Sequence, residues 1–383
     1  MSELSLMIAA TAAKVFADAS PADGFEAALW RRVEEAGLDR VLMPEDHGGA
    51  GDAFEAAVAI ACAAGAAAVS VPICETLLAN WALATAGIEV NAGPKAIWLD
   101  EGRLLRRAPA GFSSPLPERA RGGDDDQGAA GVADAPSTTL PHKVGESANA
   151  AVANSVVWQP SATQTVAITA DGLNACAVGS AMCEGKIIAS VAGEPCMQAE
   201  LVLLAHDRRT LPLPISMPMA LYATLVAASL FGAMQSINAI TFEYANTRKQ
   251  FGRTLGAFQA IQHMAAKMAE DAAATEAAVT VAARELNTRG RAHESDPDRS
   301  LWHAAVAKGR ASEAAGKIAA GAHQIHGAIG FTREHTLHRY TRRLWAWRDR
   351  AGSEQHWYEV IGQAALATGH DGLWPGITSG LKL

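Results

Sequence analysis

The side chains best suited to binding chemistry stand together between residues 248 and 263. This stretch reads Arg-Lys-Gln-Phe-Gly-Arg-Thr-Leu-Gly-Ala-Phe-Gln-Ala-Ile-Gln-His. Arg248 offers a planar fork of donors that matches a pair of phosphate oxygens. A helix starting after it would add free backbone N–H groups, which favour negative charge, and Gln259 and Gln262 can donate and accept at a ring edge. The stretch predicts a site for an anion with a flat group beside it, although a helical corner with a solvated arginine and a buried phenylalanine has the same pattern.

Hydrophobic residues on both sides of this stretch predict two long helices. A spacing of three and four residues is typical of one buried helical face. Upstream, Val226, Leu230, Met234 and Ile237 have this spacing. Downstream, Phe258, Ile261, Ala265 and Met268 have it. The joint between two helices therefore carries the cations, amides and glycines.

The same stretch resembles the acyl-CoA dehydrogenase flavoprotein family. Arg-x-Gln-Phe-Gly from Arg248, followed by Phe-Gln-x-Ile-Gln-His from Phe258, is similar to that family's signature. The segment Gln-Ile-His-Gly-Ala-Ile-Gly-Phe-Thr from Gln324 is similar to its Gln-x-x-Gly-Gly-x-Gly-Tyr/Phe-Thr loop. Pro-Glu-x-x-Gly-Gly-x-Gly from Pro44 is a weaker likeness to the family's N-terminal domain. The two stronger matches occur in the order that the family has.

The resemblance implies FAD as the cofactor and a set of residues for its ADP end. The segment Ala-Gly-Ser-Glu-Gln from Ala351 resembles the family's Glu-Gly-Thr-x-Gln, in which the Thr and Gln positions touch FAD. Ala328 stands where the family usually has a second glycine. The residues that match FAD-contacting positions are Arg248, Gln250, Phe251, Phe258, Gln259, Gln324, Ile325, His326, Gly327, Ala328, Gly330, Ser353 and Gln355.

The catalytic base of the family has no counterpart at its usual positions. Desaturation of a thioester needs a carboxylate of raised pKa over a weakly acidic α-proton. The usual glutamate is Ala351 here, and the second position used by some members falls at Tyr222 or a close neighbour. Asp349 and Glu354 are the nearby carboxylates, but the run from Arg342 to Arg350 is more typical of a solvated, salt-bridged helical face. The base is therefore unknown.

The family's flavin-wrapping segment, Glu-Pro-x-x-Gly-Ser-Asp ahead of a Trp-x-Thr strand, is also missing between residues 99 and 169. The segment Pro-Ala-Gly-Phe-Ser-Ser-Pro from Pro109 and a stretch without periodicity, 113–139, occupy this region. Trp158 is expected in a core. The groups for a neighbour's FAD are thus kept, while those for the chain's own flavin ring and substrate are lost.

This contrast predicts one subunit of a heteromeric FAD-dependent acyl-CoA dehydrogenase, as in bacterial steroid side-chain enzymes. The subunit would hold the ADP end of FAD across an interface, and an acyl-CoA dehydrogenase-like partner would supply the base. One alternative is a self-sufficient homo-oligomeric enzyme with a relocated base. Others are a non-catalytic structural homologue and a flavin oxidase or monooxygenase on the same fold. The acyl chain and the electron acceptor stay open.

The order of elements predicts an α+β, mostly α fold in three domains. Residues 1–94 form an N-terminal helical domain. Residues 95–210 show short alternating apolar runs with turn-rich breaks, typical of a small, degenerate middle β-domain of antiparallel strands. Residues 211–383 form a C-terminal four-helix bundle that serves FAD and oligomerisation, with helices near 219–247, 258–288, 301–325 and 333–368.

Composition narrows the possible classes of protein, partner and cellular compartment. The chain has 383 residues, 49% hydrophobic and 19% charged, which is typical of a globular protein. A net charge of −8 argues against a nucleic-acid partner. Five cysteines without metal spacing predict reduced thiols and no metal site. No secretory signal is recognised, and no stretch of about twenty apolar residues without a charge is expected, so we predict a cytoplasmic protein without a membrane partner.

Overall fold

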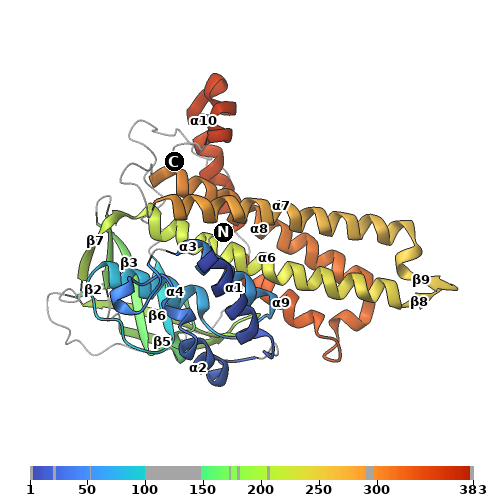
Figure 1. The fold of residues 1–383 in the computed structure, drawn as a ribbon, viewed down its shortest axis with the longest axis horizontal. Helices are drawn as coiled ribbons and strands as arrows, with labels where there is room; N and C mark the ends of the chain where they lie inside the picture. The colour runs from blue at the N-terminus through green and yellow to red at the C-terminus, as the bar shows by residue number, and fades with distance from the viewer. Residues whose placement is uncertain are drawn as a thin grey trace, which may run out of the picture.

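The fold is known from a computed structural model, which describes residues 3–19, 23–51, 53–99, 148–171, 174–178, 182–204, 208–289 and 297–379. It confirms the mostly helical α+β fold. Figure 1 shows the β-strands gathered at one end of three long helices, with the N-terminal helices packed along the side of these helices. The predicted loop 113–139 and the segment from Pro109 lie outside the described residues.

The N-terminal part is helical, as predicted. Its helices are α1 (Glu3–Phe16), α2 (Ala27–Glu35), α3 (Phe54–Ala66) and α4 (Ile73–Thr85). Helix α2 ends before Gly37, which has a φ of +68° and lets the chain leave the helix at no steric cost. Helix α4 is buried along most of its length, although its first turn holds the carboxylate of Glu75.

The middle part contains two sheets. The four-stranded sheet has the order β1-β3-β4-β7 and the three-stranded sheet the order β2-β6-β5. The strands are β1 (Lys95–Leu99), β2 (Ala148–Val157), β3 (Gln164–Asp171), β4 (Asn174–Val178), β5 (Met182–Ala189), β6 (Pro195–Leu204) and β7 (Arg208–Pro214). In the second sheet, Ala148 lies opposite Leu204 in an antiparallel pair. Trp158, just after β2, is buried as expected.

Two features of these sheets differ from the prediction. Strand β1 runs parallel to β3, with Lys95 opposite Gln164, whereas all pairs were expected to be antiparallel. Strand β7 contains Pro212 and Pro214, which fall inside the range 211–383 predicted for the C-terminal helical bundle. Proline is tolerated there because β7 is the edge strand of its sheet.

The C-terminal part is built around helix α6 (Ser216–Thr247), which packs on α3, α7, α8 and α9. The other helices are α7 (Gln259–Arg289), α8 (Pro297–His326), α9 (Leu337–Trp347) and α10 (Glu354–Ser379). Two glycines let α3 and α6 approach closely. A Cβ atom at Gly65 would lie 2.0 Å from the carbonyl oxygen of Ser229, and one at Gly232 would lie 2.0 Å from that of Cys62.

The last predicted helix, 333–368, is in fact two helices. The break falls at residues 348–353, where Ala351 and Gly352 have φ angles of +56° and +88°. Helical periodicity continues on both sides of this break, so the sequence pattern did not reveal it.

Helix α6 corrects one premise of the membrane prediction. It has no charged residue between Ser216 and Phe242, and by length and composition it is apolar enough to cross a bilayer. The expectation that no such stretch exists was therefore wrong. The apolar segment lies entirely inside the fold, as the core helix of a globular protein does.

Candidate functional site

The predicted anion-binding stretch forms the tip of the long helices. Between α6 and α7 lie two short strands, β8 (Lys249–Gln250) and β9 (Arg253–Thr254), which Figure 1 places at the end farthest from the sheets. Phe251 occupies the turn with a φ of +51° and a side chain 90% exposed. The Arg253 guanidinium lies 4.0 Å from the ring centre of Phe258. Arg248, Gln250 and Gln259 are exposed at the same tip.

The loop from Gly327 to Phe331 begins where α8 ends. A Cβ atom at Gly330 would lie 3.0 Å from Cβ of His326 and 3.1 Å from the Leu337 side chain, so glycine packs closely there. Gln324, Gly327 and Ala328 are exposed. His326 is buried, and its ring stacks on Tyr244 of α6 with centroids 4.4 Å apart. This stack holds the loop against the last turns of α6, next to the tip.

The side chains of Ile325 and His326 face the core and not the surface. Both are buried, and Nδ1 of His326 makes a 2.9 Å hydrogen bond with the carbonyl oxygen of Ala322. A cofactor on this surface would not meet these two side chains. Fewer side chains of the predicted FAD set are therefore exposed than the sequence suggests.

Ser353 and Gln355 lie elsewhere. The ammonium of Lys308 in α8 donates 2.8 Å hydrogen bonds to the carbonyl oxygens of Arg348 and Gly352, which places the 348–353 loop beside the middle of α8. From Lys308 to His326 there are 18 residues of α8, or about 27 Å at 1.5 Å per residue. The predicted FAD residues thus form two separate patches, the tip with its neighbouring loop and the 353–355 patch.

The 348–353 loop carries Ala351, which stands at the family's usual base position. The indole N–H of Trp357 donates to the carbonyl oxygen of Ala351 at 2.8 Å, and Ser353 caps α10 by accepting from the backbone N–H of His356 at 3.3 Å. With the two Lys308 bonds, these contacts fix the loop despite its two left-handed residues.

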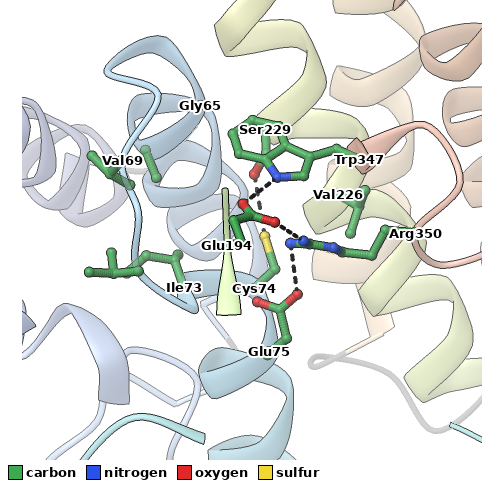
Figure 2. Close-up of a pocket in the computed structure, with 12 residues that line it drawn as sticks. Gly65, Val69, Ile73, Cys74, Glu75, Glu194, Val226, Ser229, Trp347 and Arg350 are labelled. Atoms are coloured by element: carbon green, nitrogen blue, oxygen red, sulfur yellow. Dashed lines mark hydrogen bonds and ion pairs between the residues drawn. The ribbon is translucent and has the colours of Figure 1, made fainter. Parts of the chain in front are cut away.

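A cluster of buried polar side chains adjoins this loop; we call Glu75, Glu194, Tyr222, Trp347 and Arg350 the Arg350 cluster. The Arg350 guanidinium donates to Glu75 at 3.1 Å and also to Glu194. The Tyr222 hydroxyl donates to Glu75 at 3.0 Å, and the Trp347 indole N–H donates to Glu194 at 2.7 Å. Figure 2 shows the two carboxylates reaching the guanidinium from different elements. These elements are α4 and the turn before β6.

Burial controls the ionisation of this cluster. It raises the pKa of Glu75, and the nearby Arg350 charge offsets this only in part. Burial also raises the pKa of Tyr222 well above its ordinary value, so the hydroxyl stays a donor. For Arg350 burial acts to lower the pKa, but Glu194 and Glu75 outweigh it and the pKa is raised. Arg350 is therefore charged at any physiological pH.

Two cavities flank the Arg350 cluster. The first, which we call the Ala351 cavity, has about 210 Å³, its open mouth included, and is lined by Leu99, Met219, Tyr222, Ala351, Gly352, His356 and Trp357. The second, the Cys74 cavity, has about 340 Å³, its open mouth included. It is lined by Ala64, Gly65, Val69, Val71, Ile73, Cys74, Glu75, Glu194, Val226, Ser229, Trp347 and Arg350. Both positions of the family's base, Ala351 and Tyr222, thus face one cavity.

The two nearby carboxylates do not line either cavity. The Asp349 side chain is 69% exposed and lies 4.0 Å from Arg348, and that of Glu354 is 35% exposed and pairs with Arg348 at 3.0 Å. The expectation of a solvated face holds for these residues but was wrong for Arg350, whose side chain is 12% exposed, and for Arg343, which is buried. A lone glutamate in the apolar helix α4 was the one sequence signal for a buried ionic partner.

Comparison with known proteins confirms the family. The acyl-CoA dehydrogenase N-terminal domain matches residues 4–91, and the acyl-CoA dehydrogenase C-terminal domain matches residues 216–366. The chain belongs to the acyl-CoA dehydrogenase family.

Three individual proteins are similar to part or most of this chain. The acyl-CoA dehydrogenase IpdE2 of Mycobacterium tuberculosis is 38% identical over 121 residues, which span 32% of this chain and about a third (34%) of that relative. The acyl-CoA dehydrogenase FadE27 of the same organism is 28% identical over 328 residues, 82% of each chain. The solved ChsE4-ChsE5 complex, also from Mycobacterium tuberculosis, matches with a TM-score of 0.69 at 18% identity, covering 97% of this chain and 99% of that chain. At this identity the structural likeness shows the fold.

Proposed function

We propose that this chain is one subunit of an FAD-dependent acyl-CoA dehydrogenase that desaturates an acyl-CoA thioester between its α and β carbons. Its exposed tip holds the ADP end of FAD across an interface, and a partner chain of the same family supplies the catalytic base. One observation carries this proposal. The cavity that receives both base positions contains Ala351 and Tyr222, and none of the described residues that line it is a carboxylate.

The missing carboxylate matters because the α-proton of a thioester is only weakly acidic. A base must stand within hydrogen-bond reach of that proton and must be desolvated enough to accept it. Tyr222 does not meet this need, since its hydroxyl is committed to Glu75 and its pKa is raised by burial. FAD, when bound, supplies the electron acceptor for the reaction.

The tip fits the phosphate end of a nucleotide cofactor. Arg248 is exposed, and α7 begins at Gln259, one short 3-10 turn (Leu255–Ala257) after the hairpin, so the start of this helix lies at the same tip. In the neighbouring loop Gly327 and Ala328 are exposed beside the tip. Because the 353–355 patch lies about 27 Å away along α8, we assign the tip to FAD shared with a neighbouring chain.

The relatives support a partner of the same family. The solved structure that matches over 97% of this chain is a complex of two differently named proteins, ChsE4 and ChsE5. We extend that arrangement to this chain as part of the proposal. A heteromer explains why residues at the family's FAD-contacting positions are kept in a chain that has Ala351 and Tyr222 at the base positions.

The test is the visible absorption spectrum and FAD content of the chain purified alone and purified with an acyl-CoA dehydrogenase chain that carries the glutamate. We expect a colourless protein alone, and about one FAD per pair of chains together with turnover of acyl-CoA. About one FAD per chain, with dehydrogenase activity in the lone protein, would overturn the proposal. A complex that never takes up flavin would favour a non-catalytic homologue.

A self-sufficient dehydrogenase is a second candidate, and His356 favours it. This side chain lines the Ala351 cavity, and its Nε2 atom is buried without a hydrogen-bond partner among the described residues. Burial lowers the pKa of His356, so the ring is neutral near pH 7 and can accept a proton. In this alternative His356→Gln abolishes turnover of the lone protein and keeps its flavin, while His370→Gln, at a fully exposed position, changes neither.

A further inference from the structure

We infer that the Arg350 cluster closes the acyl pocket of this chain, so that acyl-CoA binds only in the partner's site. This inference rests on the proposed function and deepens it. The proposed function concerns the absence of a base. The inference concerns the space that an acyl chain would need.

The cluster lies between the two cavities. Tyr222 forms part of the wall of the Ala351 cavity, and the other four members of the cluster line the Cys74 cavity. The hydrogen bond from Tyr222 to Glu75 joins the two walls. A thioester with its α-carbon beside Ala351 would therefore meet the cluster before it reached the second cavity.

The Cys74 cavity has the lining that an acyl chain prefers. Much of its wall is hydrocarbon, contributed by Val69, Val71, Ile73 and Val226. Apolar surface of this kind favours an aliphatic group over water. The charged part of the same cavity is formed by Glu75, Glu194 and Arg350, and Glu75 is the member that bonds Tyr222. The ionic groups thus stand at the point where an acyl chain would enter.

The cluster is built as a fixed plug and not as a gate. Glu75 comes from α4, Glu194 from the turn before β6, and Arg350 from the loop after α9. Glu75, Glu194, Tyr222 and Trp347 are buried, and each makes at least one of the four hydrogen bonds described above. To admit a ligand, three segments would have to separate and leave charges without partners in the interior, which is strongly unfavourable.

The test is the stoichiometry of a thioester analogue that cannot be desaturated, 3-thiaoctanoyl-CoA, titrated calorimetrically into the FAD-loaded complex. We expect one analogue per pair of chains for the wild type. The variant Glu75→Ala/Glu194→Ala/Arg350→Ala removes all three charges together and should raise this number toward two. The matched control Glu285→Ala/Arg299→Ala removes an ion pair between α7 and the start of α8 and should leave it at one.

Each result decides the question. Two analogues per wild-type pair would overturn the inference, as would one analogue per pair in a folded triple-alanine variant. If that variant does not fold, Glu75→Gln/Glu194→Gln/Arg350→Ala keeps amide acceptors for Tyr222 and Trp347 and opens only the arginine's space. This second variant should bind a second analogue more weakly. If the folded variant binds only one analogue per pair, the result counts against the plug. FAD content and turnover of the wild-type complex are measured in parallel, because their failure would reject the proposed function instead.

Discussion

The ammonium of Lys308 donates a 2.8 Å hydrogen bond to the carbonyl oxygen of Gly352, 44 residues later in the chain. The same ammonium binds the carbonyl oxygen of Arg348 at 2.8 Å and the hydroxyl of Ser312 at 2.7 Å. Lys308 is buried in α8, and its three donors meet three acceptors. One side chain therefore holds both ends of the loop that carries Arg350 and Ala351.

We expect Lys308→Met to lower the free energy of unfolding by about 2 kcal/mol, because the carbonyl oxygens of Arg348 and Gly352 lose a charged donor. Chemical denaturation measures this change, and hydrogen exchange should show faster exchange in residues 348–353. Lys317→Met is the control, since Lys317 is exposed and pairs with Glu313 at the surface. Its effect should stay within about 0.5 kcal/mol. Equal effects of the two changes would show that the loop does not depend on Lys308.

Arg350 is the second stability test. Arg350→Met leaves Glu75 and Glu194 buried without their cation, and we expect a loss of about 3–5 kcal/mol in the free energy of unfolding. The variant Glu75→Gln/Glu194→Gln/Arg350→Met removes all the charge and keeps amide oxygens for Tyr222 and Trp347. It should recover most of the loss in chemical denaturation. A triple variant as unstable as Arg350→Met would mean that volume or geometry, and not unpaired charge, sets the cost.

The contrast between the tip and the Arg350 cluster explains what sequence could predict. The tip residues from Arg248 to Gln259 lie within one short segment, so their spacing indicated the turn, while the cofactor chemistry assigned to it stays a prediction. In the Arg350 cluster, Glu75 and Arg350 are 275 residues apart, and only tertiary packing brings them together. Arg350 follows other arginines in sequence, and that context made it look solvated.

The fold shows the same division between local and tertiary control. Apolar periodicity predicted the long helices α6, α7 and α8 closely, because a face that is apolar over seven or more turns has few other solutions. The break at residues 348–353 depends instead on contacts with Lys308 and Trp357, which lie far from it or on the next helix. To predict strand β7, one must know that it lies at the edge of its sheet, and short apolar runs do not show this.

Three histidines near the end of α8 make stability depend on pH. Burial is the main cause that lowers the pKa of His323, His326 and His335 below the ordinary value of 6.5. As pH falls through 6.5, the unfolded chain binds protons that the folded chain does not, so stability falls with pH from about 6.5 down to the lowered folded pKa values.

We expect His323→Gln to reduce the loss of unfolding free energy between pH 7 and pH 5, because one of these histidines no longer titrates. The comparison of variant and wild type at each pH cancels other groups, including Glu75, whose raised pKa acts in the opposite direction. His370→Gln, at a fully exposed position, is the control. An unchanged pH dependence in His323→Gln would contradict the assignment.

The crossing of α3 and α6 should be sensitive to single methyl groups. Gly232→Ala would place its Cβ 2.0 Å from the carbonyl oxygen of Cys62, so the helices must separate. We expect a loss of at least about 1–3 kcal/mol in the free energy of unfolding, measured by denaturation. Gly362→Ala is the matched control, because no atom lies within 4 Å of the added Cβ. It should be neutral or stabilise α10 by about 0.5–1 kcal/mol.

The tip offers the most direct test of cofactor binding. Arg248→Ala removes the planar fork that we assign to a phosphate of FAD, and a charge-assisted hydrogen bond of this kind corresponds to about 10- to 100-fold in affinity. Equilibrium dialysis of FAD against the complex with its partner chain should show this loss. Lys249→Ala, in the same exposed hairpin, removes one charge without the fork and should have a much smaller effect. If both changes weaken FAD equally, the tip acts only through its general positive charge, and Arg248 has no specific place on the cofactor.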